Sequence, residues 1–157
     1  MKLSKKNIIN KLIKKKLTIS VAESCTGGKL SAEFTSVKDS SKIFEFGLVT
    51  YSNKSKVNIL KIPKKIIREH GTVSERVCLI MLKNLRKIGK TNISISITGI
   101  AGPGGGTKKK PIGLVFVGIK KANKIIVKKY LFKNKGRPYI QKAAVNKSFG
   151  LILSFLK

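Results

Sequence analysis

Apolar residues recur along the chain at two spacings, one that suits helices and one that suits strands. Spacings of three and four positions predict helices that begin near Ser4, Gly28, Asn53, Pro63, Ser74 and Pro138. Short apolar or alternating runs predict strands at 17–22, 46–52, 92–98, 112–119 and 125–132. This alternation is typical of an α/β domain with a mainly parallel sheet, which the hairpin of the last two strands makes mixed. We expect one domain over residues 1–157, because this length is enough for one sizeable core.

Several of the predicted helices start at residues that commonly cap helices. Ser4, Asn53 and Ser74 each offer a side-chain oxygen to the free N–H groups of a first turn. Pro63 and Pro138 suit a first turn because the proline ring fixes φ near the helical value. We therefore expect five helices to begin at these positions.

Three loops that follow predicted strands have the least ordinary sequences in the chain. They are ESCTGG at 23–28, YSNKSK at 51–56 and TGIAGPGGG at 98–106. In an open α/β sheet the ligand crevice lies beyond the carboxyl ends of the strands. We therefore expect the functional site in these loops.

The first loop offers a candidate nucleophile, Ser24, between a strand and a helix. A hydroxyl at this place lies near backbone N–H groups that can hold an oxyanion, those around Thr26–Gly28. Gly27 and Gly28 also let a substrate approach the backbone closely. The alternative is that Ser24 or Thr26 only caps the helix. Cys25 is a rival nucleophile, although a cysteine in such a turn is more often a small buried filler.

The second loop offers a candidate base, Lys56. A lysine accepts a proton only if its pKa falls from ~10.4 toward neutrality, which burial or a neighbouring cation such as Lys54 would cause. Serine with lysine as its base is an established nucleophile–base pair. The alternative is that Lys56 is one of the many solvated surface lysines.

The third loop, residues 98–107, suits an anion. Its successive backbone N–H groups would form an anion nest, and the lysines at 108–110 raise the local positive potential. A phosphate or phosphoribosyl group is the expected guest. Arg137 is a second candidate for a phosphate or carboxylate, and the alternative is an exposed charge at a helix start. We assign His70 a structural role.

The composition excludes some chemistry and narrows the partners. The chain has one His and one Asp, so a metal site with several such ligands cannot be built. The net charge of +29 comes from basic residues spread along the whole chain, with few aromatic residues. This distribution favours solvated surface lysines over a dedicated nucleic-acid interface, and nucleic acid would bind at most non-specifically.

The cysteine content and the apolar runs bear on the cellular compartment. Two cysteines without a CxxC pair indicate neither a zinc site nor a disulfide framework, and they fit a reducing cytoplasm. The longest apolar runs fall short of a membrane span, and the N-terminus lacks the apolar core of a secretory signal. We therefore expect a cytoplasmic location.

Six segments together resemble the CinA C-terminal domain family, which includes stand-alone nicotinamide mononucleotide deamidases. The segments are AESCTGG (22–28), DSS (39–41), VTYSNKSK (49–56), HGTVSE (70–75), TGIAGPGGGT (98–107) and KPIG (110–113). They occur in the family's order and cover nearly the whole chain. The resemblance implies a three-layer α/β/α sandwich with a mixed, mainly parallel sheet.

The same resemblance implies an activity and a set of site residues. The activity is hydrolysis of nicotinamide mononucleotide to nicotinate mononucleotide and ammonia, without metal or cofactor, by a homo-oligomer. The implied catalytic residues are Ser24 and Lys56, with Tyr51. The implied substrate-binding residues are Thr26, Gly27, Gly28, Ser41, Thr98, Gly99, Gly102, Gly104, Gly105 and Arg137.

The chain departs from the family pattern at three positions near these residues. Lys54 stands where an acidic residue is usual, Gly136 where an acidic residue commonly precedes the arginine, and Gln141 where a further arginine usually follows. The lysines of the Gly-rich loop are then an alternative source of phosphate contacts. Two other functions stay open, a catalytically silent nucleotide binder and a competence or nucleic-acid-associated protein. The additional N-terminal domain of larger family members has no counterpart in this sequence, and its activity is not carried over.

Overall fold

The computed structural model describes residues 4–156, which form six α-helices, one short 3-10 helix and five strands. The helices are α1 (Lys5–Lys14), α2 (Lys29–Thr35), α3 (Asn53–Asn58), α4 (Lys64–His70), α5 (Glu75–Gly89) and α6 (Arg137–Ser154), with the 3-10 helix η1 (Ser40–Lys42). The strands are β1 (Ile19–Glu23), β2 (Phe44–Val49), β3 (Ile93–Gly99), β4 (Leu114–Lys121) and β5 (Lys124–Leu131).

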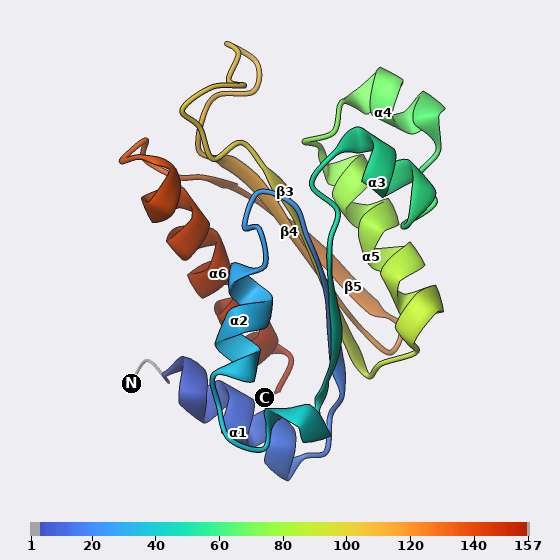
Figure 1. Cartoon of the computed structure of the whole chain (residues 1–157), viewed down its shortest axis with the longest axis vertical. Helices are drawn as coiled ribbons and strands as arrows, with labels where there is room; N and C mark the ends of the chain where they lie inside the picture. The colour runs from blue at the N-terminus through green and yellow to red at the C-terminus, as the bar shows by residue number, and fades with distance from the viewer. Residues whose placement is uncertain (1–3, 157) are drawn as a thin grey trace.

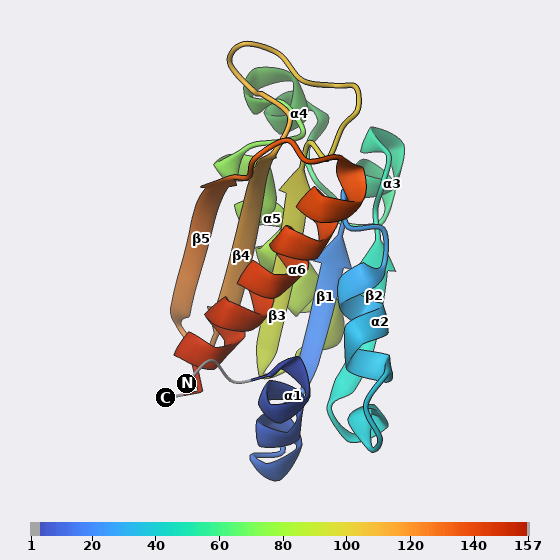
Figure 2. The ribbon, with the colours of Figure 1, turned by 90° about the vertical axis from the view of Figure 1, so that its left-hand side faces the viewer.

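The strands form one sheet in the order β2-β1-β3-β4-β5. The strand β1 runs parallel to both β2 and β3, whereas β4 is antiparallel to β3 and to β5. Four strands therefore point the same way and β4 points back. Helices α1, α2 and α6 cover one face, and α3, α4 and α5 cover the other (Figures 1 and 2). The predicted three-layer α/β/α sandwich with a mixed sheet is confirmed.

Two apolar layers hold the sheet between the helices. The larger core joins α1, α2 and α6 to one face through side chains such as Leu12, Phe34 and Phe149. The smaller core packs Met81 and Leu85 of α5 on the other face. Both faces of the central strands are covered, so every residue of β1 is buried. The edge strand β2 instead alternates between half-buried and exposed residues.

The capping predictions are confirmed at two helices and wrong at a third. The Oγ atoms of Ser4 and Ser74 accept hydrogen bonds from first-turn N–H groups of α1 and α5. At α3 the cap is Ser52 rather than Asn53. The Ser52 Oγ accepts from the N–H of Ser55 at 3.0 Å, and the Ser55 hydroxyl oxygen accepts from the Ser52 N–H. This reciprocal pair satisfies two groups at once, which the single Asn53 side chain would not do.

The parallel strands bring the three unusual loops to one edge of the sheet. The residues Glu23 and Val49 are paired at the carboxyl ends of β1 and β2, and β3 ends beside them at Gly99. The loop after β3 and the α3–α4 region stand above this edge (Figure 1). The parallel register of β1, β2 and β3 therefore brings the loops that follow these strands together as one candidate site.

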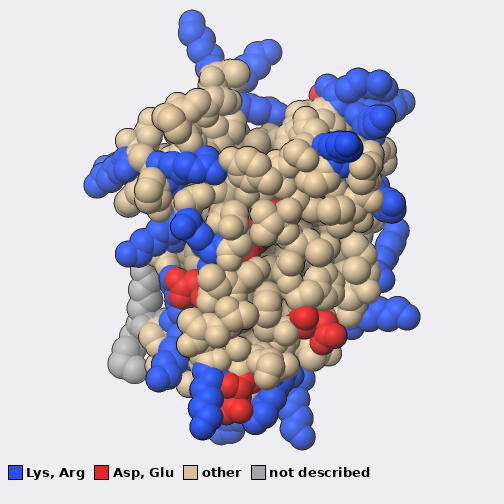
Figure 3. All heavy atoms as spheres, in the orientation of Figure 1, with Lys and Arg blue, Asp and Glu red and all other residues tan. Residues whose placement is uncertain are grey.

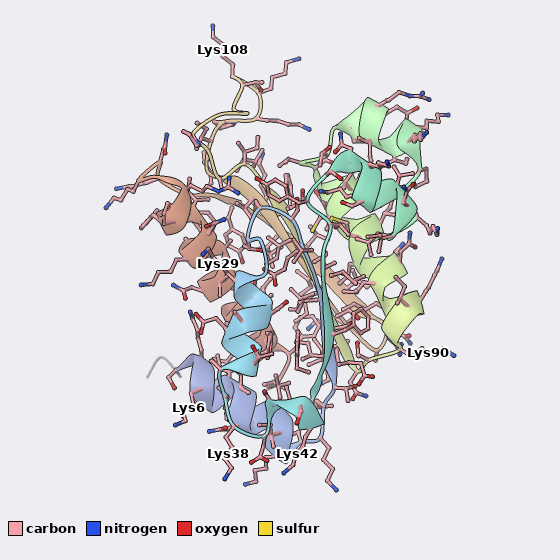
Figure 4. All side chains as sticks on the ribbon, in the orientation of Figure 1. Lys6, Lys29, Lys38, Lys42, Lys90 and Lys108 are labelled. Carbon is pink, nitrogen blue, oxygen red and sulfur yellow. The ribbon has the colours of Figure 1, made fainter. Side chains whose placement is uncertain are left out.

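Basic side chains are spread over the surface. On the face shown in Figure 3, Lys and Arg surround a broad area of other residues, with a few acidic groups among them. The side chains of Lys6, Lys42, Lys90 and Lys108 lie at different edges of the molecule (Figure 4). Across residues 4–156, no helix combines the length and the apolar character that crossing a membrane requires.

Candidate functional site

Ser24 begins the turn between β1 and α2, and the backbone holds this residue from the sheet. Its N–H donates to the carbonyl of Ile97 in β3 at 3.1 Å, and its own carbonyl accepts from the N–H of Gly27 at 3.0 Å. The turn continues through Gly28, whose φ of 94° lies in the left-handed region that favours glycine. These contacts place the Ser24 side chain at the carboxyl edge of the sheet.

The buried carboxylate of Glu23 fixes the start of α2. It accepts hydrogen bonds from the N–H groups of Gly28, Leu30 and Ser31, at 3.2, 3.0 and 2.8 Å. The Ser31 hydroxyl donates to the same carboxylate at 2.7 Å. An anion suits this place because the N–H groups of a first helical turn have no partner within the helix. The nucleophile turn is thus fixed between a central strand and a capped helix.

Lys56 reaches Ser24 from α3. Its Nζ lies 2.9 Å from Ser24 Oγ and donates to the carbonyl of Thr50 at 2.6 Å. The carbonyl of Tyr51 lies further away, at 3.4 Å from Nζ. The structure therefore brings together the two residues proposed as nucleophile and base, although 32 positions separate them in sequence.

Burial changes the proton affinity of this lysine. Lys56 is fully buried, and loss of solvent lowers the pKa of its ammonium from 10.5 to about 8. A lysine with this pKa is neutral in an appreciable fraction of molecules near pH 8. Lys56 is therefore a buried residue and not one of the solvated surface lysines.

Cys25 lies next to Ser24 but in a different environment. It is almost completely buried, and burial raises the pKa of its thiol to about 12. A Cβ on Gly99 would lie 3.0 Å from the Cys25 sulfur, so glycine at this position lets the end of β3 approach the turn. A thiol that stays protonated is a poor nucleophile. Lys56 Nζ contacts Ser24 Oγ, so the structure favours Ser24 over Cys25.

The N–H groups expected to hold an oxyanion are mostly engaged. Gly27 donates to the Ser24 carbonyl and Gly28 donates to Glu23. The turn and the Glu23 carboxylate therefore already use two of the N–H groups expected around Thr26–Gly28. Between residues 4 and 156 the N–H groups of Cys25 and Thr26 donate to no other residue, so these two groups are the available donors of the turn.

Arg137 forms the opposite wall of the site, at the first turn of α6. Its guanidinium donates to the carbonyl of Gly102 at 3.0 Å and to the Tyr51 hydroxyl at 2.8 Å. The Tyr51 side chain is 60% exposed, so its hydroxyl serves the mouth of the site and not the Ser24–Lys56 bond. A cleft of about 260 Å³ lies between this wall and Ser24.

The Gly-rich loop lines the same cleft with backbone. Gly99, Gly102, Gly104 and Gly105 all contribute to its surface. In the described part of the chain, the N–H groups of Gly102, Gly104 and Gly105 donate to no protein acceptor. Backbone N–H groups without a protein acceptor are suited to bind an anion. The cleft therefore has a candidate nucleophile on one side and candidate anion-binding groups on the other.

Two of the lysines that follow this loop do not face the cleft. Lys108 points away from the body of the protein (Figure 4). Lys110 donates its Nζ hydrogen to the carbonyl of His70 at the end of α4. These two lysines therefore do not replace a second arginine beside Arg137. His70 takes part in this contact through its backbone carbonyl.

Five of the expected substrate-binding residues do not line the cleft, namely Thr26, Gly27, Gly28, Ser41 and Thr98. Thr98 is buried, and its hydroxyl donates to the carbonyl of Thr72 at 3.1 Å, so it supports the cleft wall from behind. Ser41 lies in η1, before the amino end of β2, whereas the site is at the carboxyl end. Within one chain the whole length of β2 separates Ser41 from Ser24, so the fold does not bring Ser41 to this cleft.

Sequence reasoning gave no role to three residues that build this site. Glu23 lies in the ESCTGG segment, and a carboxylate shortly before a Gly-Gly helix start could have predicted that it caps α2. Thr72 lines the cleft from the α4–α5 connection. Gln141 of α6 donates its side-chain N–H to the Cys25 carbonyl at 2.8 Å. No local pattern pointed to that contact, because its partners are 116 positions apart.

Other parts of the surface lack this combination. A hollow of about 440 Å³ between α2 and α6 and one of about 500 Å³ between α3 and α4 are larger, but neither is lined by Ser24. Over the described range 4–156, no three His, Cys, Asp or Glu side chains gather closely enough to hold a metal ion. The cleft at Ser24 is the candidate site on chemical grounds.

Comparison with known proteins gives consistent matches over the whole fold. The family model described as "CinA C-terminal domain" matches residues 2–156. A "CinA-like protein" of Syntrophus aciditrophicus is 43% identical over 122 residues, which are 78% of this chain and 29% of that protein. The crystal structure of the competence/damage inducible protein CihA from Agrobacterium tumefaciens is 30% identical, with a TM-score of 0.92 and full coverage of both chains.

A second solved structure extends the comparison. A competence-damaged protein (CinA) superfamily protein from Escherichia coli is 26% identical, with a TM-score of 0.90 over 99% of this chain and 94% of that one. The chain spans between 26% and 36% of the length of the curated relatives that it matches. The likeness therefore covers one part of those longer proteins.

Proposed function

This chain belongs to the CinA C-terminal domain family, and from that premise we propose that it is an amidohydrolase acting on nicotinamide mononucleotide. The products would be nicotinate mononucleotide and ammonia. One observation carries the proposal, the 2.9 Å contact between Ser24 Oγ and the Nζ of the buried Lys56. A hydroxyl bonded to an amine of lowered pKa, beside a cleft, is the arrangement that acyl transfer requires.

In the proposed mechanism Ser24 attacks the carboxamide carbon. Neutral Lys56 takes the proton from Ser24 Oγ as the C–O bond forms, and the carboxamide oxygen becomes an oxyanion near the Thr26 N–H. Lys56 then delivers a proton to the amide nitrogen, the C–N bond breaks and ammonia leaves. Water attacks the resulting ester with Lys56 again as base, which releases nicotinate mononucleotide and restores the Ser24 hydroxyl.

The opposite wall of the cleft supports a phosphorylated substrate. Arg137 and the free N–H groups of the Gly-rich loop are suited to phosphate oxygens, as a guanidinium and an anion nest are in general. The Tyr51 hydroxyl holds the guanidinium of Arg137 in this wall. A pyridine amide at Ser24 and a ribose phosphate toward Arg137 would use both walls.

The deciding experiment measures ammonia release from nicotinamide mononucleotide in metal-free buffer. Wild type is compared with Ser24→Ala, Lys56→Ala and Cys25→Ala. We expect the first two variants to lose at least ~10³-fold in turnover and Cys25→Ala to keep most of it. A folded wild type that binds the mononucleotide without releasing ammonia would contradict the proposal in favour of a silent binder.

The nucleic-acid alternative is tested separately. The surface lysines predict weak binding to any polyanion, with an affinity that falls steeply as salt rises. A strong preference for one defined nucleic acid at physiological salt would instead support a nucleic-acid function.

The free, buried thiols Cys25 and Cys78 fit a reducing cytoplasm, which we propose as the location. The homo-oligomer implied by the resemblance stays a prediction.

A further inference from the structure

Gln141 is one of two polar residues on the buried, mainly apolar face of α6. It is 7% exposed, between the fully buried Ile140 and Ala144 on α6. Its side-chain Nε2 donates a hydrogen bond to the Cys25 carbonyl, outside the helix, at 2.8 Å. The other buried polar residue of this helix, Ser148, bonds only to its own helix, at the Ala144 carbonyl. Gln141 is thus the buried polar contact between α6 and the nucleophile turn.

The Cys25 carbonyl depends on this contact. In the described part of the chain, no other donor reaches it. Cys25 follows Ser24 directly in the chain, and its carbonyl belongs to the peptide that joins Cys25 to Thr26. On the other side of Ser24, its N–H is fixed to Ile97 of β3. The nucleophile is therefore held between two backbone contacts, one to the sheet and one to α6.

Gln141 shares its helix face with Arg137, one turn earlier. Arg137 donates to Tyr51 and Gly102 at the mouth of the cleft, whereas Gln141 donates to the turn beneath. Residues four apart lie on one side of a helix, so a single rigid element contacts both walls. The apolar contacts of Ile140 and Ala144 fix this helix against the core.

We propose that Gln141 is a positioning residue, whose amide holds the Cys25 carbonyl and thereby keeps Ser24 Oγ within hydrogen-bond reach of Lys56 Nζ. The inference rests on the Ser24 nucleophile of the proposed function and not on its substrate. A small displacement of a nucleophile from its base reduces the rate steeply. Gln141 acts through the turn and makes no contact with the reacting atoms.

The experiment follows covalent labelling of Ser24 with a fluorophosphonate probe by intact-mass spectrometry. Ser24 Oγ forms a bond to phosphorus, fluoride leaves, and Lys56 takes the hydroxyl proton. Gln141→Met keeps the length of the side chain but removes the donor. Gln141→Asn keeps the amide, but its side chain is one methylene shorter and does not reach the Cys25 carbonyl. This variant tests the inference if Gln141→Met does not fold. Ser148→Ala is the control, because it removes a buried polar group from the same helix.

We expect both Gln141 variants to label about 10- to 100-fold more slowly than wild type, with the final extent still one probe per chain. A merely structural role would lower the extent, through loss of folded protein, and would leave the rate of the folded fraction unchanged. Ser148→Ala is expected to label at the wild-type rate. Labelling of Gln141→Met or Gln141→Asn at the wild-type rate would overturn the inference.

The same experiment separates this inference from the proposed substrate. If wild type labels at Ser24 but releases no ammonia from nicotinamide mononucleotide, the substrate proposal fails and the slow labelling of the Gln141 variants still supports the positioning role. If the probe does not react with Ser24 in wild type, both the nucleophile and its positioning residue are overturned.

Discussion

The two walls of the cleft are built in different ways. The buried wall consists of Ser24, Lys56 and the Thr50 carbonyl, which are joined by contacts of 2.9 and 2.6 Å at the ends of adjacent strands. The open wall consists of Tyr51, Gly102 and Arg137, and a long side chain from the start of α6 joins them. Ser24 and Lys56 of the first wall are 7% and 0% exposed, whereas Tyr51 of the second is 60% exposed.

This difference indicates that the buried wall suits the chemical step and the open wall suits binding of the substrate phosphate. A neutral amine needs burial, and a nucleophile needs a fixed distance to its base, so the buried wall suits bond breaking. A charged phosphate needs exposed donors that adjust as the ligand arrives, and the open wall offers those. Substitutions on the buried wall are therefore expected to change kcat, and those on the open wall to change KM.

The largest effect is expected from Lys56→Arg. The guanidinium stays protonated and cannot accept the Ser24 proton, so turnover should fall at least ~10³-fold. Steady-state ammonia release measures the loss. Lys54→Arg is the matched control, because Lys54 is exposed on the same helix and should change turnover less than about twofold. Retained turnover in Lys56→Arg would remove Lys56 from the role of base.

The next effect concerns stability and tests the burial of Lys56 directly. Its folded pKa of about 8 lies below the ordinary 10.5, so between these values the unfolded chain binds more protons and stability rises with pH. The free energy of unfolding of wild type, relative to Lys56→Met, should rise by about 3 kcal/mol between pH 7 and pH 11. The other lysines titrate in both proteins and cancel in the difference.

Urea denaturation at a series of pH values measures this difference. A constant difference across the range would show that the folded protein does not shift the pKa of Lys56. The contrast between the two walls would then lose its physical basis.

On the open wall, Arg137→Gln should raise KM for nicotinamide mononucleotide by about 10- to 100-fold, because a charge-assisted contact to phosphate is lost. The value of kcat should change less than about threefold, since Ser24 and Lys56 are untouched. Lys135→Gln, an exposed charge just before α6, is the control. The variant should also discriminate less between the mononucleotide and its riboside. A fall in kcat with KM unchanged would place Arg137 on the chemical side instead.

The smallest effect is the pH dependence of the wild type. Since the proton must be absent from Lys56, kcat/KM should rise about tenfold between pH 7 and pH 9 and level off above the pKa. Rates measured at constant ionic strength give this profile. A profile that is flat over this range would show that Lys56 does not titrate there in the free enzyme.

Much of the fold could be predicted because its signals are local. Apolar spacing within one or two turns marks α1, α5 and α6, and alternation marks the strands. A cap depends on residues three apart, and here the predicted cap, Asn53, was wrong by one position. The nearby Ser55 decided it, because its hydroxyl completes the reciprocal pair with Ser52.

The candidate site was predictable only in part. Ser24 and Lys56 follow adjacent parallel strands, so an α/β pattern was enough to expect them at one edge. Ser41 was expected at the site because its segment resembles the family. In the fold, however, Ser41 lies before β2, at the far end of the sheet from Ser24. The roles of Glu23 and Gln141 could not be predicted in this way. Glu23 accepts from N–H groups at the start of α2, and Gln141 donates to the Cys25 carbonyl, and only the folded chain shows that these backbone groups need a side-chain partner.

The sequence by itself determined the elements, their order and the identity of the reactive side chains, because these follow from backbone and side-chain preferences within a few residues. Only the tertiary structure decided that Lys56 loses its solvent, that Cys25 stays an inert thiol and that Gly28 is occupied by Glu23. Each of these depends on groups that come together from distant parts of the chain. Desolvation and hydrogen-bond partnership are properties of the packed neighbourhood, and no single stretch of sequence contains it.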